Sequence, residues 1–290
     1  MATEPAALSL KPMRVSACLQ SIKAMSFNIW ADAPFNRSWA GRRDAIADVV
    51  RQHSPDVAGL QEATAPMIRD LQERLPEYRW VGVGRDDGRE SGEFTPIFFH
   101  SARWNLDQQA TFWLAAVCDL PGRGWDALCC RTVTWACLTH KETGRRCVHF
   151  NTHLDHLGHN ARAQSALLLL QKIQEIATDQ PTVVTGDFNC RESSTPYRIL
   201  TGEMAFSEKR KASGPLRDAR RESKAKPEGP YRTYRGLLQW IGIGRIDYIF
   251  VKNGFETLRY VVTNDARGAS DHRPVLAEMA FVNGARDEEP

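Results

Sequence analysis

Short apolar segments of two different periods succeed one another along this chain, and their order constrains its fold more than any other feature. Met25, Phe27 and Ile29 stand at every second position, the period of a half-buried strand. The stretch 160–178 instead repeats its apolar residues at helical spacing. Further strands are expected at 56–62, 78–83, 94–99, 110–114, 131–139, 147–153, 182–185, 245–251, 256–263 and 275–282, and further helices before Ser54 and before Pro76. Because strands and helices mix without strict βαβ alternation, the pattern predicts a layered α/β or α+β sandwich.

The chain shows no internal boundary. No Gly/Ser-rich or Pro-rich linker divides its 290 residues, so we expect one domain over 23–283, a loosely ordered leader at 1–22 and a tail at 284–290. The longest apolar stretch, Ala166 to Leu170, is too short to cross a bilayer, and the first twenty residues lack the pattern of a secretory signal. Seven cysteines without a C-x-x-C pair are typical of free thiols. A cytoplasmic protein with no membrane span is therefore predicted.

Charge leaves the partner open. A formal net charge of +3 is too small to indicate a groove for duplex nucleic acid. The stretch 205–232 is basic and irregular, which favours a solvated loop, with a rim for an anionic substrate as the alternative. No protein partner is evident.

Polar side chains cluster where the predicted strands end. They are Asn28, Glu62, Asn151 and His153, Asp187 and Asn189, Asp247, and Asp271 and His272. Taken singly, each has an ordinary structural interpretation as a cap or a strand-end hydrogen-bonding group. One end of a sandwich would gather them all into a single cleft. Together they offer oxygen ligands for a hard divalent cation, a carboxylate to activate water, and two histidines to stabilise a phosphoryl transition state.

Two other kinds of hydrolase site, a zinc site and a nucleophilic serine, fit this sequence less well. The run from Asn151 to His156 is one residue away from H-x-H-x-D-H, the zinc signature of metallo-β-lactamase-like hydrolases, but Asn replaces the first His. Zinc prefers nitrogen or sulfur donors, and a zinc site would leave Glu62 and Asp187 unexplained. A serine hydrolase needs a G-x-S-x-G turn, and neither Ser91 nor Ser213 lies in one.

Six motifs in a fixed order carry a resemblance to a known family. They are Ser26-Phe-Asn28, Leu60-Gln-Glu62, Asn151-Thr-His-Leu-Asp-His156, Gly186-Asp-Phe-Asn189, Arg245-Ile-Asp-Tyr-Ile-Phe250 and Ser270-Asp-His272. In this order they resemble the endonuclease/exonuclease/phosphatase (DNase I-like) superfamily from about Lys23 to Val282. The intervening sequence, such as Gly92-Glu-Phe-Thr-Pro-Ile-Phe-Phe99, resembles a mostly uncharacterised, chiefly bacterial branch.

The resemblance implies a four-layer sandwich, with two mixed sheets face to face and helices outside. It also implies a hydrolase of phosphoesters, a phosphodiesterase or phosphatase that depends on Mg²⁺ or Mn²⁺. The implied substrate is a phosphorylated small molecule, such as a sugar phosphate or nucleotide, or a short single-stranded nucleic acid. A catalytically inactive scaffold of the same fold is the alternative, although such a scaffold is expected to have lost one of Glu62, Asp187 or His272.

Motif matching also implies a role for each site residue. Glu62 is the principal metal ligand, supported by Asn28 and Asp271, and Asp187 orients the attacking water. The remaining roles are phosphate binding by Asn151 and Asn189, charge stabilisation by His153 and His272, and orientation of His272 by Asp247. Glu93 falls where some relatives carry an acid that pairs with the first histidine, here His153, with an ordinary exposed Glu as the alternative.

Departures from better-known relatives bear on the substrate. Ala63-Thr-Ala follows the L-Q-E motif where abasic-site endonucleases carry Lys, and Arg245-Ile-Asp247 replaces the Cys-Asp-Arg of inositol polyphosphate phosphatases. Neither activity is therefore expected. Trp113 and Trp125 are predicted to line the entrance and stack on a sugar or base, and Arg131 to bind phosphate, with ordinary packing or a salt bridge as the alternative for each.

Overall fold

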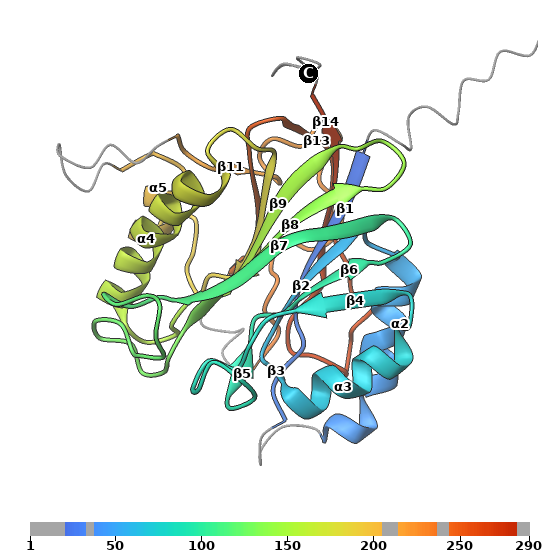
Figure 1. The fold of residues 1–290 in the computed structure, drawn as a ribbon, viewed down its shortest axis with the longest axis horizontal. Helices are drawn as coiled ribbons and strands as arrows, with labels where there is room; N and C mark the ends of the chain where they lie inside the picture. Colours follow the sequence, from blue (N-terminus) through green and yellow to red (C-terminus); the bar gives the residue numbers. More distant parts are fainter. Residues whose placement is uncertain (1–20, 33–37, 205–213, 237–243, 283–290) are drawn as a thin grey trace, which may run out of the picture.

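Two six-stranded mixed β-sheets lie face to face in the computed structural model of the chain, which describes residues 21–32, 38–204, 214–236 and 244–282 (Figure 1). In the first sheet the strand order is β13 (Phe255–Val262), β14 (Val275–Phe281), β1 (Ser21–Asn28), β2 (Val57–Gln61), β6 (Ile97–His100) and β4 (Tyr78–Val81). In the second it is β11 (Arg217–Asp218), β12 (Asp247–Lys252), β10 (Thr182–Asp187), β9 (Arg146–His153), β8 (Thr132–His140) and β7 (Trp104–Trp113). Only β1 with β2 and β9 with β10 pair in parallel among these strands. A small ribbon of β3 (Ala63–Thr64) and β5 (Glu93–Phe94) stands apart.

Helices cover the outer face of each sheet. Helices α2 (Arg43–His53) and α3 (Ala65–Arg74), with the 3-10 turn η1 (Trp39–Gly41), pack on the first sheet, and α4 (His159–Ala177) and α5 (Thr195–Leu200) pack on the second (Figure 1). Each helical layer has its own apolar core, and a third core, which includes Ile22, Val57, Val183 and Ile249, lies between the sheets. The predicted four-layer sandwich is confirmed, because every sheet has two faces to bury.

The central strands are buried on both faces. Strand β1 was predicted to be half-buried, yet Ser26 and Asn28 are as inaccessible as Phe27. Their face of the sheet meets the second sheet rather than water, so the prediction of a solvated face was wrong. Gly59 in β2 permits this close approach, because a Cβ there would lie 2.0 Å from Thr185 Oγ1 and 2.4 Å from Asn151 Oδ1 across the interface.

Most predicted elements occur near their expected bounds, and the differences have physical causes. Strand β7 begins at Trp104 rather than at 110. Residues 105–110 form an exposed part of this edge strand, and their polar sequence lacks the apolar alternation from which a strand is predicted. The single strand expected at 94–99 is divided into β5 and β6. Helix α5 was not predicted. The predicted leader and tail lie outside the described residues, apart from Ser21 and Ile22, which are the first two residues of β1.

Three further features of the described residues bear on the sequence predictions. None of their helices is long and apolar enough to cross a membrane. All of the cysteines within these ranges are free thiols. In the basic stretch, Arg217, Arg221 and Lys224 are paired with acidic side chains, which fits the solvated-loop interpretation, and residues 205–213 lie outside the described ranges.

Candidate active site

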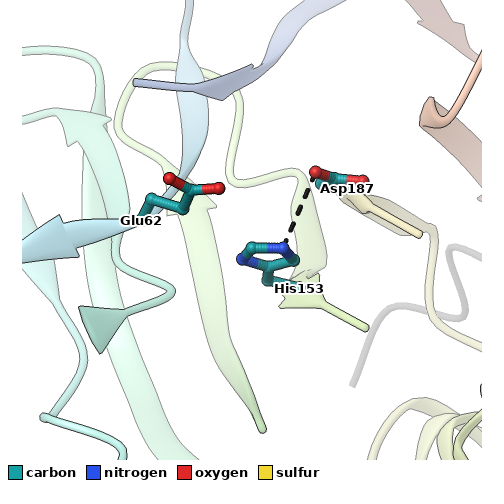
Figure 2. A group of neighbouring side chains, drawn as sticks. All are labelled: Glu62, His153 and Asp187. Atoms are coloured by element: carbon teal, nitrogen blue, oxygen red, sulfur yellow. Dashed lines mark ion pairs between the residues drawn. The ribbon is translucent and has the colours of Figure 1, made fainter. Parts of the chain in front are cut away.

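Strand register places three of the predicted site residues in one row. Asp187 at the end of β10 pairs with His153 of β9 on one side and with Asp247 of β12 on the other. In the facing sheet, Asn28 ends β1 beside Gln61, and Glu62 follows directly. One donor atom each from Glu62, His153 and Asp187 lies within 4.8 Å of the other two (Figure 2). The sandwich thus brings carboxylates from both sheets together at one end.

Tight backbone turns aim these side chains inward. Trp30, Glu62 and Asn189 all adopt left-handed backbone conformations, with φ of 62°, 61° and 46°, which non-glycine residues rarely adopt. Such conformations persist only where surrounding contacts hold them. Here the Ala31 N–H donates to Glu62 Oε2 at 2.8 Å, and the Asn189 N–H donates to Asp187 Oδ1 at 2.9 Å. The turns are therefore part of the arrangement of the site.

Asn28 links the two carboxylates. Its Nδ2 donates to Glu62 Oε1 at 2.8 Å and to Asp187 Oδ2 at 3.1 Å, while its Oδ1 accepts from the Trp30 N–H at 3.0 Å. The Trp30 contact fixes which end of the amide faces the carboxylates. In this orientation Asn28 positions Glu62 and Asp187 and presents a donor, not an oxygen ligand, to the centre of the site.

Asp187 is a carboxylate poised to hold a proton. It is 2% exposed. Burial and the nearby Asp247 raise the pKa of Asp187 to about 7, against the opposing effects of His272, the Asn189 N–H and Asn28. A carboxylate with a pKa in this range can accept and release a proton near neutral pH.

Asp247 and His272 form a buried pair. His272 Nδ1 lies 3.1 and 2.9 Å from the two oxygens of Asp247, and its Nε2 lies 3.7 Å from Asp187 Oδ2. Burial disfavours the imidazolium, but Asp247, Asp187 and Asp271 outweigh it and raise the pKa of His272 to about 10. His272 is therefore a fixed cation that faces the row of carboxylates.

His153 is a neutral imidazole with a defined tautomer. Asn189 Nδ2 donates to the Leu154 carbonyl and contacts His153 Nε2, both at 3.0 Å. Because Nδ2 is a donor, Nε2 must accept and the ring proton resides on Nδ1. Burial and the cations Arg131 and Arg85 lower the pKa of His153 well below its usual value. The two histidines of the site thus carry different charges.

The donor set fits a hard divalent cation. Asp271 Oδ1 is buried without a hydrogen-bond partner among the described residues, and burial and Glu62 raise the pKa of Asp271 against the effect of His272. Glu62 and Asp187 add two more carboxylates. A cation would satisfy the unpartnered oxygen and relieve the repulsion, and oxygen-rich donors suit Mg²⁺ or Mn²⁺. A second group, Asp187, Asp247 and His272, also lies within this range, but His272 Nδ1 already holds both oxygens of Asp247.

The structure corrects the role of Asn151. Its Nδ2 donates to the carbonyls of Leu60 and Pro96 at 2.7 and 3.0 Å, and its Oδ1 accepts from Gln61 Nε2 and Thr185 Oγ1 at 2.7 and 3.0 Å. Both amide hydrogens are used, so no donor remains for phosphate. Asn151 joins the two sheets in the interior instead.

Trp113 also departs from its predicted role. It is 5% exposed, and its Nε1 donates to the Arg85 carbonyl at 2.7 Å, so it is a packing residue that cannot stack on a substrate at the entrance. Trp125 is 40% exposed and remains available for that role. Arg131 is buried beside His153, and its role as a phosphate ligand stays a prediction.

The zinc interpretation of the 151–156 motif does not fit the structure. Asp155 accepts from the backbone N–H groups of Leu157 and Gly158 at 3.0 and 2.8 Å and so caps a turn. His156 Nδ1 contacts Arg131 Nη2 at 3.0 Å. With Asn151 buried between the sheets, the side chains of this motif do not converge on one centre.

Two supporting residues escaped sequence analysis. Arg42 is buried and donates to the carbonyls of Ile29 and Ala269 at 2.5 and 3.1 Å, which joins the loop after Asn28 to the loop before Asp271. Arg85 forms a 2.6 Å ion pair with Glu93. Glu93, predicted to pair with His153, lies 4.0 Å from its Nδ1. An arginine carries no local signal for such contacts, because its partners are distant in sequence.

Comparison with known proteins shows the family and the fold. The sequence model of the Endonuclease/Exonuclease/phosphatase family matches residues 25–272. The structure of an endonuclease/exonuclease/phosphatase from Bacteroides vulgatus is 34% identical with a TM-score of 0.82 and covers 90% of this chain and 99% of its own. A mannosyl-6-phosphatase from Bacteroides thetaiotaomicron is 30% identical with a TM-score of 0.81 and covers 90% of this chain and 100% of its own. No curated protein matches significantly.

A more distant similarity shows the fold alone. The human Nocturnin catalytic domain with bound sulfate is 23% identical, with a TM-score of 0.70 over 90% of this chain and 95% of its own. The layered sandwich defines a DNase I-like fold, and the carboxylate and histidine cluster at its end is its candidate active site. This chain belongs to the endonuclease/exonuclease/phosphatase family.

Proposed function

We propose that this protein is a phosphoester hydrolase that depends on a divalent metal ion, Mg²⁺ or Mn²⁺, and acts on a small phosphorylated substrate. The observation that carries the proposal is the convergence of Glu62, His153 and Asp187 within 4.8 Å (Figure 2). The cationic His272 lies beside Asp187. A carboxylate cluster beside a fixed cation suits phosphoryl transfer, in which negative charge gathers on the phosphoryl oxygens.

Glu62 and Asp271 would hold the metal ion, and Asn28 would keep Glu62 and Asp187 in place. When bound, the ion supplies Lewis-acid stabilisation of a phosphoryl oxygen. The near-neutral pKa of Asp187 suits the carboxylate that orients the attacking water and takes its proton. The water oxygen forms a new bond to phosphorus, and the bond from phosphorus to the ester oxygen breaks. The departing oxygen takes a proton from solvent, so the products are an alcohol and a phosphate.

Donors around the phosphoryl group come from His153 of the second sheet and from His272, which lies just before β14 of the first sheet. His272, held cationic by Asp247, would donate through Nε2 to a phosphoryl oxygen. Asn189 Nδ2 uses both of its hydrogens on the Leu154 carbonyl and on His153 Nε2, so Asn189 would act by holding His153 in place beside Asp187. His153 would orient the phosphate through Nδ1. Asn151 has no part in this step.

Sugar phosphates and nucleotides are the first substrates to test, since a 30% identical structure is that of a mannosyl-6-phosphatase. Short single-stranded nucleic acid is the further candidate. An inactive scaffold is less favoured because Glu62, Asp187 and His272 are all present and converge.

The test is hydrolysis of p-nitrophenyl phosphate and bis-p-nitrophenyl phosphate by metal-stripped protein to which Mg²⁺, Mn²⁺ or Zn²⁺ is returned. Turnover with Mg²⁺ or Mn²⁺ that is lost in Asp187→Asn supports the proposal. Asp265→Asn, a carboxylate at the surface, is the matched control and should leave turnover unchanged. Absence of turnover on both esters and on a panel of sugar phosphates, nucleotides and oligonucleotides would favour the inactive scaffold.

A further inference from the structure

A small cavity lies beside His153, on the side of the ring that bears Nδ1. Arg85, Glu93, Thr95, Arg131, Thr132 and His153 line it, together with a phenylalanine. About 10 Å³ is open to the centre of a water-sized sphere, which is room for one water-sized group. His153 belongs to both the cavity and the active site, so whatever occupies the cavity lies next to the reacting centre.

Unused hydrogen-bond donors gather around this cavity. Arg131 Nε and Nη1 and His153 Nδ1 are buried and have no hydrogen-bond partner among the described residues. The ring proton resides on Nδ1, as the Asn189 contact requires. Arg131 Nη2 contacts His156 at 3.0 Å, and its Nε lies 3.6 Å from Asp155 Oδ2. Because a buried donor without an acceptor is costly, such a set of donors points to a ligand atom that accepts.

The one acid that lines the cavity is already paired. Glu93 forms its 2.6 Å ion pair with Arg85 and stays 4.0 Å from His153 Nδ1. Arg85 thus balances the charge of Glu93. Arg131 has Asp155 as its own counter-charge on the Nε side, but its Nη1 has no hydrogen-bond partner among the described residues and stays available to a ligand. The position of Arg85 is itself fixed, since its carbonyl accepts from Trp113 Nε1 at 2.7 Å.

We infer that this cavity receives a non-bridging oxygen of the substrate phosphoryl group, and that it selects phosphomonoesters over phosphodiesters. The inference rests on the proposed function and deepens it. Three oxygens lie around phosphorus during in-line displacement. In a monoester all three are bare, whereas in a diester one carries a carbon substituent. The metal ion expected at Glu62 and Asp271 would bind one of these oxygens, and His272 would donate a hydrogen bond to the second. The third oxygen would then face Arg131.

Size supplies the selection, and charge adds to it. An ester oxygen that carries a methyl group is larger than the one water-sized group that the inner part of the cavity holds, so it would enter less deeply and lie farther from Arg131 than a bare oxygen. A bare oxygen carries negative charge, which the guanidinium of Arg131 binds more strongly than a neutral ester oxygen. An ester oxygen is therefore expected to bind in this cavity more weakly than a bare oxygen, because it is larger and uncharged.

The test compares p-nitrophenyl phosphate with methyl p-nitrophenyl phosphate, two substrates with the same leaving group that differ by one methyl on phosphorus. Wild-type protein with Mg²⁺ should strongly favour the monoester. In Arg131→Gln, kcat/KM for the monoester should fall ~10²-fold, while that for the methyl diester should change less than about tenfold. Arg131→Ala, which enlarges the cavity, should raise kcat/KM for the methyl diester relative to kcat/KM for the monoester. Arg69→Gln, an exposed arginine, is the control and should alter neither value.

Several results would overturn the inference. The first is a wild-type kcat/KM that is similar for the two esters. The second is an equal decrease in kcat/KM for both esters in Arg131→Gln. Should Arg131→Gln and Arg131→Ala fail to fold by circular dichroism, Arg131→Lys keeps the charge without the planar fork and should still shift the ratio of the two esters toward the diester. An unchanged ratio in Arg131→Lys would then count against the inference.

Binding separates this inference from the proposed function. By calorimetry with Mg²⁺ present, wild-type protein should bind inorganic phosphate but not dimethyl phosphate, and Arg131→Gln should lose this difference. If wild-type protein hydrolyses neither ester but shows the difference in binding, the hydrolase proposal fails and the anion cavity stands. Equal binding of the two anions would reject the cavity even if hydrolysis occurs.

Discussion

The carboxylate of Asp247 reaches Nδ1 of His272 with both of its oxygens, at 3.1 and 2.9 Å, although the two residues come from distant elements of the sandwich. Asp247 begins β12 of the second sheet, and His272 precedes β14 of the first. The Thr233 hydroxyl accepts from the Asp247 N–H at 3.1 Å, and Ser270 Oγ accepts from the His272 N–H at 3.0 Å. The backbone of each partner is thus held by a hydrogen bond to a nearby side chain.

The pair is expected to act as a unit in catalysis. Asp247→Asn and His272→Ala should each lower kcat by ~10² or more, as loss of a transition-state stabiliser does. The double variant should be little worse than the worse single one, because groups that act together are not additive. Steady-state kinetics with saturating Mg²⁺ measure this. Asp265→Asn breaks a second Asp–His contact, with His53 at the surface, and should leave kcat unchanged; fully additive losses would reject the pairing.

The same pair gives the protein a pH-dependent stability. The pKa of His272 is about 10 in the folded state, against 6.5 for an ordinary histidine. The folded state therefore binds the proton more tightly, and this contribution is full below pH 6.5 and is lost as the pH rises through 10. In EDTA, the Tm advantage of wild type over Asp247→Asn/His272→Gln should shrink between pH 7 and 10, by roughly 2–4 °C per unit. A constant difference over this range would contradict the assignment.

Glu62 should control metal affinity. Glu62→Gln keeps the shape of the side chain but removes its charge, so half-maximal activity should require ~10²-fold more Mg²⁺. The rise in Tm that Mg²⁺ gives the wild-type protein should also disappear, and this readout does not depend on turnover. Glu175→Gln, on the exposed face of α4, is the control. Unchanged activity at limiting Mg²⁺ would argue against Glu62 as a ligand.

Metal binding should depend on pH through Asp187. Because the pKa of Asp187 is raised to about 7 in the metal-free protein, a cation must displace its proton in acid. The increase in Tm on adding Mg²⁺ should therefore be larger at pH 8 than at pH 5. Thermal unfolding with and without EDTA at both values measures this difference. Asp187→Asn should reduce the pH dependence, and equal Mg²⁺ effects at the two pH values in wild type would show that the proton on Asp187 is not coupled to the binding of the nearby metal ion.

Asn151 is expected to matter for stability rather than for chemistry. In Asn151→Ala the Leu60 and Pro96 carbonyls and the Gln61 amide lose a buried partner, at about 1–3 kcal/mol for each group left unpaired. We expect a loss of roughly 2–4 kcal/mol in urea unfolding, with kcat of the folded protein within about tenfold of wild type. Asn105→Ala on the exposed part of β7 is the control. A large loss of kcat with unchanged stability would restore the phosphate role.

The outcome for Asn151 shows the limit of reading a strand from its period. Sequence alternation correctly placed Asn151 and His153 on one face of their strand, but that face runs from the middle of the interface between the sheets to its open end. His153 reaches the end beside Asp187, and Asn151 stays inside. Two residues of similar polarity therefore have different roles because of a difference in depth, which periodicity does not encode.

The sequence by itself determined the family, the layered fold and most of the carboxylates and histidines, because strand period and motif order are local properties of the chain. Tertiary structure alone decided the tautomer of His153, the cationic state of His272, the inward packing of Trp113 and the pairing of Arg85 with Glu93. Each of these depends on burial and on a partner from another segment. Charge state and hydrogen-bond direction are set by three-dimensional surroundings, so they could not be predicted before the two sheets were brought together.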